Sequence, residues 1–88
     1  MSEHIAIYHP KAPGEARSFY TYYSDISDEL GKAFWDELLS TLETARAFPT
    51  HHHFDSTDLR RASLKRFPVH ILFRDLPLAI RITTIRHD

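Results

Sequence analysis

Basic side chains concentrate in one stretch of the sequence, LRRASLKRFPVHILFR at residues 59–74. Guanidinium groups form paired hydrogen bonds with phosphate or carboxylate, so this stretch favours an anionic partner. Residues 1–58 contain four Lys/Arg against ten Asp/Glu, and residues 59–88 contain seven against two, within a net charge of −1. We therefore expect a basic face that binds an anion, unless the two halves merely screen one another. The candidate binding residues are Arg60, Arg61, Lys65, Arg66, Arg81 and Arg86.

Two histidines accompany these cations, His70 and His87. Histidine is the side chain whose charge changes near neutral pH, which suits proton transfer in RNA cleavage. That reaction needs a base for the ribose 2′-hydroxyl, an acid for the leaving oxygen and cations for the developing charge. His87, Arg61 and Arg81 are the catalytic candidates, but the sequence offers no convincing second acid or base. The alternative is an ordinary polar histidine at the end of a strand.

A histidine cluster, HHHFD at residues 51–55, raises the question of a metal site. In an extended chain His51, His53 and Asp55 would point to one side and offer nitrogen and oxygen ligands. The spacing matches no established site, so we predict no metal and interpret the cluster as polar loop surface. With two glycines the chain has no Gly-rich phosphate loop, and we expect no cofactor. Without cysteine it has neither disulfides nor thiolate chemistry.

The elements that position these residues begin with a short alternating strand at residues 5–8. Apolar residues then recur every three or four positions over residues 13–26 and again over residues 28–48, which predicts two amphipathic helices. Ser27 or Asp28 is a suitable cap for the second helix. The connection is so short that the two helices must form an antiparallel hairpin.

The C-terminal third of the sequence indicates three strands, at residues 59–65, 68–74 and 78–87, joined by short turns. We expect a three-stranded antiparallel meander that packs against the hairpin, and so a single α+β domain at residues 1–88, two-layered, in the order β-α-α-β-β-β. The side chains expected to face the helices are Val69, Ile71, Phe73, Ile80 and Ile82. The opposite set, expected on an exposed, mixed and basic face, is His70, Leu72, Arg74, Arg81, Thr83, Ile85 and His87.

The chain resembles the RelE/ParE superfamily of bacterial type II toxin–antitoxin toxins, often called plasmid stabilisation proteins. The resemblance rests on YY at 22–23, LGKAFWDELLSTL at 30–42, Pro49, LRRASLKRFPVHILF at 59–73 and IRITTIRH at 80–87. The run Arg-Arg-x-x-Leu-x-Arg-Phe-Pro is its specific part. The resemblance implies the fold expected above and neutralisation by a small cognate antitoxin.

The superfamily divides into RelE-like endoribonucleases, which cut messenger RNA on the ribosome, and ParE-like members, which poison DNA gyrase. Val69 stands where many relatives have tyrosine, and the sequence ends at His87-Asp88 where many continue with a basic and aromatic tail. The pI of about 6.6 also suits a ribosomal site poorly. We therefore expect a ParE-like toxin that inhibits growth by binding a target such as gyrase rather than by catalysis. The alternatives are a RelE-like endoribonuclease, with the ribosome and mRNA as partners, and a non-toxic antitoxin-binding relative.

Two exposed apolar side chains on the second predicted helix, Trp35 and Leu39, are expected to receive the antitoxin together with the basic face. An acidic, amphipathic antitoxin segment would match both surfaces. The first residues of the sequence lack a basic and apolar leader, and no apolar run approaches the roughly 18 residues of a membrane span. We therefore expect a cytoplasmic protein without a membrane partner.

Overall fold

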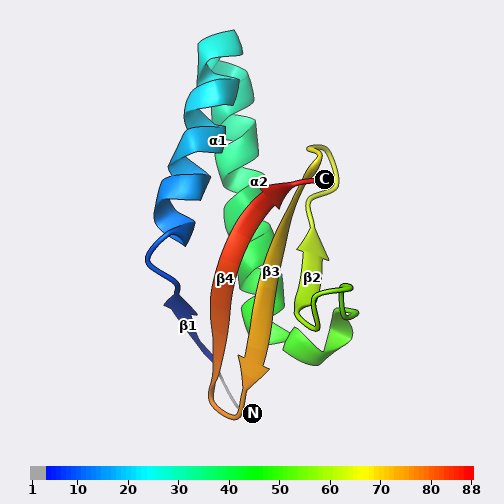
Figure 1. The fold of residues 1–88 in the computed structure, drawn as a ribbon. Helices are drawn as coiled ribbons and strands as arrows, with labels where there is room; N and C mark the ends of the chain where they lie inside the picture. Colours follow the sequence, from blue (N-terminus) through cyan, green and yellow to red (C-terminus); the bar gives the residue numbers. More distant parts are fainter. Residues whose placement is uncertain (1–3) are drawn as a thin grey trace.

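The computed structural model describes residues 4–88 and places two helices on one face of a four-stranded sheet (Figure 1). The elements are β1 (Ile5–Tyr8), α1 (Ala12–Ile26), α2 (Asp28–Ala47), the 3-10 helix η1 (Pro49–His51), β2 (Arg60–Ser63), β3 (Val69–Leu76) and β4 (Ala79–His87). The sheet order is β1-β4-β3-β2, in which β1 is parallel to β4 and the other pairs are antiparallel. The predicted two-layer α+β fold and its element order are confirmed. Within residues 4–88 no helix is both long and apolar enough to span a membrane.

The helical hairpin is held at its tip by a cap and by a close contact. The Leu30 N–H donates to Ser27 Oγ at 3.0 Å, so Ser27 caps α2, one of the two predicted choices. The helices approach so closely at Gly31 that a Cβ there would lie 2.0 Å from Ser24 Oγ and 2.9 Å from Ser24 Cα. The two helices can therefore pack this closely only because residue 31 is a glycine, which has no side-chain carbon.

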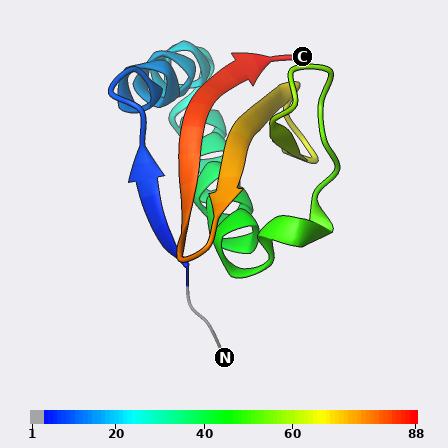
Figure 2. The ribbon, with the colours of Figure 1, turned by 60° about the horizontal axis from the view of Figure 1, so that its bottom comes forward.

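The hydrophobic core lies between the hairpin and the sheet. Figure 2 shows these two layers of the backbone from another side. Phe34 of α2 is at its centre, with its ring centroid 5.0 Å from that of Tyr23 and 5.4 Å from that of Phe67. Each large apolar side chain buried there contributes about 1.5–3 kcal/mol to folding. The residues predicted to face the helices are all fully buried: Val69, Ile71, Phe73, Ile80 and Ile82.

A β-bulge in β4 corrects part of the predicted face assignment. Leu72 pairs with Thr84, but the next residue, Phe73, pairs with Ile82, so Thr83 is an extra residue. The alternation of side chains shifts by one beyond the bulge. Ile85 therefore turns into the core and is 3% exposed, whereas the sequence predicted an exposed position.

The same shift moves other residues of the predicted basic face. Thr84 and Arg86, rather than Thr83, Ile85 and His87, continue the face of the sheet that points away from the helices, which we call the outer face. The prediction that this face is exposed was also wrong at two positions, because Leu72 and His70 are buried.

The backbone of β4 has two different hydrogen-bonding partners along the edge that faces β1. Backbone pairing with β1 continues only to Ile82, whose carbonyl accepts the His9 N–H at 2.8 Å. Beyond it, the Glu15 carboxylate of α1 accepts the Ile85 N–H at 3.0 Å and the Thr84 hydroxyl at 2.8 Å. The Glu15 side chain thus accepts a hydrogen bond from a backbone N–H of β4 that no neighbouring strand pairs with.

An ion pair fastens the segment between η1 and β2 to the sheet. Arg60 Nε donates to Asp75 Oδ1 at 2.9 Å, and Arg60 Nη1 donates to the His52 carbonyl at 2.8 Å. The guanidinium carbon lies 4.2 Å from the centroid of the Phe54 ring. The hydrogen bond from Arg60 lowers the pKa of Asp75, against the opposing effect of burial. Figure 2 shows this segment running beside β2.

We expect Gly31→Ala to lower the free energy of unfolding by about 1–3 kcal/mol, because the new methyl group meets the Ser24 backbone and α1 and α2 must separate. Gly14→Ala is the matched control. A Cβ at Gly14 meets nothing within 4 Å, so this change in α1 should raise stability by about 0.5–1 kcal/mol. Urea unfolding followed by circular dichroism measures both. Equal effects of the two substitutions would contradict the close approach at Gly31.

We expect Asp75→Asn to lower the free energy of unfolding at pH 7 by about 1–2 kcal/mol, because it removes a charged hydrogen bond from a largely buried arginine. A depressed pKa in the folded state stabilises the fold above the unfolded value of about 4, and this contribution is lost as the pH falls further. The difference between wild type and variant should therefore shrink between pH 5 and pH 2.5 in urea titrations. Asp36→Asn, which breaks an exposed pair with Lys32, should change stability by less than about 0.5 kcal/mol at either pH.

Candidate partner-binding site

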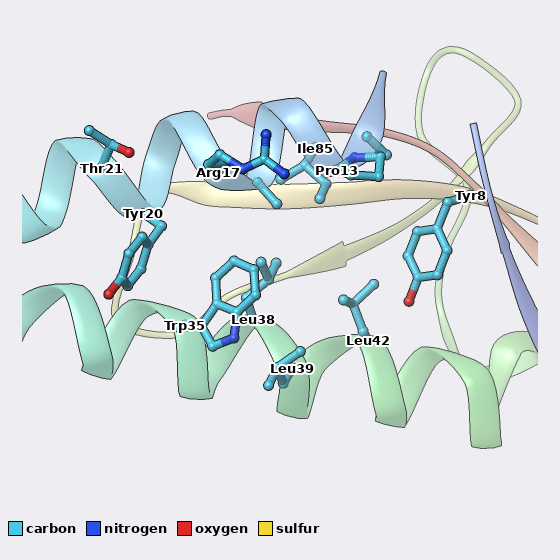
Figure 3. A pocket seen from close by; sticks show the side chains of 12 residues that line it. Tyr8, Pro13, Arg17, Tyr20, Thr21, Trp35, Leu38, Leu39, Leu42 and Ile85 are labelled. Atoms are coloured by element: carbon cyan, nitrogen blue, oxygen red, sulfur yellow. The ribbon is translucent and has the colours of Figure 1, made fainter. Parts of the chain in front are cut away.

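An open apolar groove of about 710 Å³ runs between α1 and α2, with β4 behind it (Figure 3). Its walls are the facing sides of the hairpin, and Ile85 of β4 lies at its floor because of the bulge. Tyr8 from β1 and Leu42 close one end of the groove, and Tyr20 with Trp35 lies at the other (Figure 3). The lining residues are Tyr8, Ala12, Pro13, Ala16, Arg17, Tyr20, Thr21, Trp35, Leu38, Leu39, Leu42 and Ile85.

The spacing of the α2 residues explains why the groove stays open. Trp35, Leu38, Leu39 and Leu42 follow the i, i+3, i+4, i+7 pattern of one helix face, but only Leu38 is buried in the core. Trp35 is 37% exposed and Leu39 is 50% exposed. The α2 helix therefore presents more apolar surface than the sheet and α1 cover, as the sequence predicted for Trp35 and Leu39.

The aromatic side chains of the groove are held in place. The Tyr20 and Trp35 rings pack edge to face with centroids 5.5 Å apart, one from each helix of the hairpin. Such a contact orients both rings without removing them from solvent. The groove is therefore preformed and needs little rearrangement to receive a ligand.

One cation, Arg17, lies among these apolar side chains (Figure 3). No carboxylate within residues 4–88 forms an ion pair with it. A segment that filled the groove would bury part of this guanidinium, and a carboxylate on the segment would offset the cost. The groove thus suits an apolar helix or strand that carries an acidic side chain.

The basic residues predicted to bind a partner are used in different ways. Arg60 is 16% exposed in its side chain and is bound to Asp75, so its hydrogen-bonding capacity is used within the fold. Arg66 Nε lies 2.9 Å from Glu37 Oε2 but keeps most of its side chain exposed. Lys65 is exposed, and its backbone N–H donates to Glu37 at 2.6 Å. Arg81 and Arg86 are exposed on the outer face.

The structure does not bring the three catalytic candidates together. His87 pairs with Val69 and Arg81 pairs with Arg74, five positions further along β3, which corresponds to about 17 Å. The bulge also turns His87 away from the outer face on which Arg61 and Arg81 lie. These residues cannot act on one phosphodiester in this arrangement.

His70, rather than His87, belongs to a polar cluster, which it forms with Asp88 and Arg61. His70 Nδ1 lies 2.7 Å from Asp88 Oδ1, and Arg61 Nη2 donates to the same oxygen at 3.1 Å. Arg61 Nε also donates to Ser63 Oγ at 3.0 Å. Sequence reasoning missed Asp88 because only the pairing of β3 with β4 places it near His70. An imidazole oriented by a carboxylate suits proton transfer, but His70 is buried, which limits its access to a substrate.

The histidine cluster after α2 packs against aromatic rings. His51 stacks on Phe48 with ring centroids 5.2 Å apart, and His52 meets Phe73 edge to face at 5.5 Å. Within residues 4–88 no three His, Asp or Glu side chains are grouped so as to hold a metal ion.

No protein-family model matches the chain, and no curated protein matches it. Among solved structures the chain is similar to one described as "Chromosomal ParDE TA system from P. aeruginosa", with a TM-score of 0.80 over 97% of this chain and 96% of that chain. The two sequences are 17% identical, so the likeness concerns the fold. This chain therefore has the ParE-like α+β fold that its resemblance to the RelE/ParE superfamily predicts.

Proposed function

We propose that the chain is the toxin of a bacterial type II toxin–antitoxin module, closer to ParE than to RelE, and that it acts in the cytoplasm. It arrests growth by binding a target protein such as DNA gyrase and is neutralised by a cognate antitoxin. The observation that carries the proposal is the open groove at Trp35 and Leu39 on a fold shared with a chain of a ParDE system. The exposed residues Lys65, Arg81 and Arg86, together with Arg66, whose side chain stays largely exposed beside Glu37, can then contact the target or the antitoxin. Arg61, like Arg60, is held by carboxylates of its own chain and is less available.

The chemistry of the groove specifies the antitoxin segment. Two antiparallel helices form the groove walls, a shape that accepts an amphipathic helix through side chains at i, i+3, i+4 and i+7. An acidic side chain within that apolar stripe would pair with Arg17. A segment of this kind folds on binding, so its affinity depends on a few buried anchors such as those that meet Trp35 and Leu39.

The separation of the catalytic candidates supports binding rather than catalysis. If the three candidates cleaved messenger RNA, His87, Arg61 and Arg81 would have to surround one scissile phosphate, but about 17 Å of strand separates His87 from Arg81. The His70–Asp88 pair beside Arg61 is the feature that favours a RelE-like endoribonuclease as the second candidate.

We expect that expression of the chain alone in bacteria arrests growth without creating new messenger-RNA 5′ ends. His87→Ala should arrest growth to the same extent, because His87 has no catalytic task in this proposal. Mapping of 5′ ends before and after induction is the measurement, and inhibition of supercoiling by purified gyrase is the direct test of the target. New ends within translated codons would establish the endoribonuclease instead. Unimpaired growth would support the other alternative, a non-toxic relative that only binds an antitoxin.

We expect Leu39→Asp to weaken binding of the antitoxin by about tenfold or more, because it places an unpaired carboxylate in the apolar groove. The probe is the product of the reading frame adjacent to the gene, measured by titration calorimetry. Leu78→Asp is the matched control, since Leu78 is 72% exposed in the turn between β3 and β4 and lies outside the groove. Equal affinities of the two variants would place the antitoxin elsewhere.

A further inference from the structure

The two edge strands of the sheet, β2 and β1, differ in what lies beside them. Segment 53–55 runs along β2, where the Arg61 N–H donates to the His53 carbonyl at 2.9 Å, and β2 itself carries the cations Arg60 and Arg61. β1 is the outermost strand on the other side (Figure 1), and its sequence, Ile-Ala-Ile-Tyr, contains no charge. Charged side chains and covering segments are the usual protection of a sheet edge. Within residues 4–88, β1 has no charged side chain of its own and no second strand beside it.

The backbone of β1 presents hydrogen-bonding groups on its open side. The N–H groups of Ile5 and His9 donate to carbonyls of β4 at 3.2 Å and 2.8 Å, so the odd-numbered residues of β1 face β4. Successive residues of a strand direct their backbone groups to opposite sides. The N–H and C=O groups of Ala6 and Tyr8 therefore point away from the sheet. These two donors and two acceptors suit pairing with another strand.

The side chains of β1 are apolar on both faces of the sheet. Ala6 packs against the core and Tyr8 lines the groove, so these two side chains lie on the helical side. By alternation Ile5 and Ile7 lie on the outer face. Ile5 is 63% exposed, Ile7 is 44% exposed and Tyr8 is 46% exposed. A strand that extended the sheet would cover apolar surface as well as backbone.

We propose that β1 pairs antiparallel with β1 of a second copy of this chain, about a two-fold axis at Ile7. In this register Ala6 of each copy lies opposite Tyr8 of the other, and each of these pairs exchanges two hydrogen bonds. Every free donor and acceptor of the two strands is then used. On the helical side the register sets a small side chain, Ala6, against the large ring of Tyr8.

Two other symmetric registers leave some of these groups unpaired. An axis at Ala6 would place Tyr8 opposite His4, whose carbonyl already accepts a hydrogen bond from Arg46 at 2.8 Å. An axis at Tyr8 would place Ala6 opposite Pro10, which has no N–H to donate. The axis at Ile7 is therefore the one that the backbone favours.

Charge and size define the kind of contact that results. On the outer face Arg81 lies beside Ile7, and three strand spacings, or about 14 Å, would separate the Arg81 residues of the two copies. At that distance their repulsion is largely screened by salt. An acidic peptide is the competing occupant, but β1 offers it no cation of its own. Strands of four residues form a small interface, so the dimer is weak and depends on concentration.

The dimer goes beyond the proposed function but affects the same groove. Tyr8 closes one end of the groove, and Ala6 of the second copy would pack against its ring. A two-fold axis perpendicular to the sheet also places both hairpins on one side of the combined sheet. The two grooves then face in the same direction, each with its Tyr8 fixed by the other copy.

The test is sedimentation velocity of the purified chain at concentrations up to about 1 mM, where weak contacts are populated. Wild type should change from monomer to dimer as the concentration rises. Ile7→Glu should raise the dissociation constant at least tenfold, because two carboxylates would face each other on the axis. Its monomer keeps its fold, since Arg81 lies directly opposite and can pair with the new carboxylate. The matched control is Ile26→Glu at the end of α1, where the side chain is 61% exposed, and it should dimerise like wild type.

A mixing experiment tests the position of the axis. A residue on a two-fold axis faces its own copy, so Ile7→Lys should weaken the dimer as Ile7→Glu does. An equimolar mixture of the two variants should restore dimerisation, because lysine then faces glutamate. Native mass spectrometry identifies the mixed dimer by its mass.

Amide hydrogen exchange of wild type provides a readout that needs no substitution. The N–H groups of Ala6 and Tyr8 should exchange more slowly in concentrated than in dilute protein, because the second copy accepts their hydrogen bonds. Equal exchange at both concentrations, a dimer unaffected by Ile7→Glu, or a mixture of the folded variants that stays monomeric would each overturn the proposal. The experiments use the chain without antitoxin or gyrase, so their outcome is independent of whether the chain arrests growth.

Discussion

The register of β4 is the constraint on which both the groove and the exposed arginines of the outer face depend. This strand pairs with β1 on one side and with β3 on the other, and it carries one extra residue, Thr83. Before the bulge, alternation places Ile80 and Ile82 in the core; beyond it, Ile85 returns to the helical side and forms the floor of the groove. The same shift aligns Arg86 with Arg81 on the opposite side. A single inserted residue therefore keeps Ile80, Ile82 and Ile85 on the helical side of the strand and Arg81 and Arg86 on the opposite side.

Ion pairing sorts the arginines into two groups. Arg60, Arg61 and Arg66 hold loops and the last strand in place through carboxylates of the same chain. Arg74, Arg81 and Arg86 are exposed and form no ion pair within residues 4–88. The net charge of −1 is therefore a poor guide to what the sheet binds, because most acidic side chains lie elsewhere, on the helices and loops. Since the sheet separates the groove from the arginines, ligands at the two surfaces need not exclude one another.

The fold could be predicted from the sequence because its local signals agree with one another. The strand Ile5–Tyr8 was predicted with its observed bounds, and the apolar periodicity of both helices placed their ends within two residues. The open groove also had a local signal, since Trp35 and Leu39 widen the apolar stripe of α2 beyond what one neighbour covers. Such features follow from residues that are close together in the sequence.

The details of the site could not be predicted, because they depend on residues far apart in the sequence. Thr83 and Thr84 are adjacent and equally suited to a strand, so nothing in the sequence locates the bulge between Leu72 and Phe73 on the partner strand. The pairing of His70 with Asp88 requires the register that the bulge sets. The use of Arg60 within the fold likewise depends on Asp75, fifteen positions away on the neighbouring strand.

The contact of Glu15 with β4 has a consequence for solubility. Where β1 ends, the unpaired backbone of β4 would offer a template for a strand of another molecule, the usual route by which open sheets aggregate. The Glu15 carboxylate occupies the Ile85 N–H and the Thr84 hydroxyl, and its negative charge repels the carbonyl oxygens of any incoming strand. Glu15 thus protects the exposed edge of β4, as a longer β1 would. Unlike a longer β1, it leaves the groove between the helices open to a ligand.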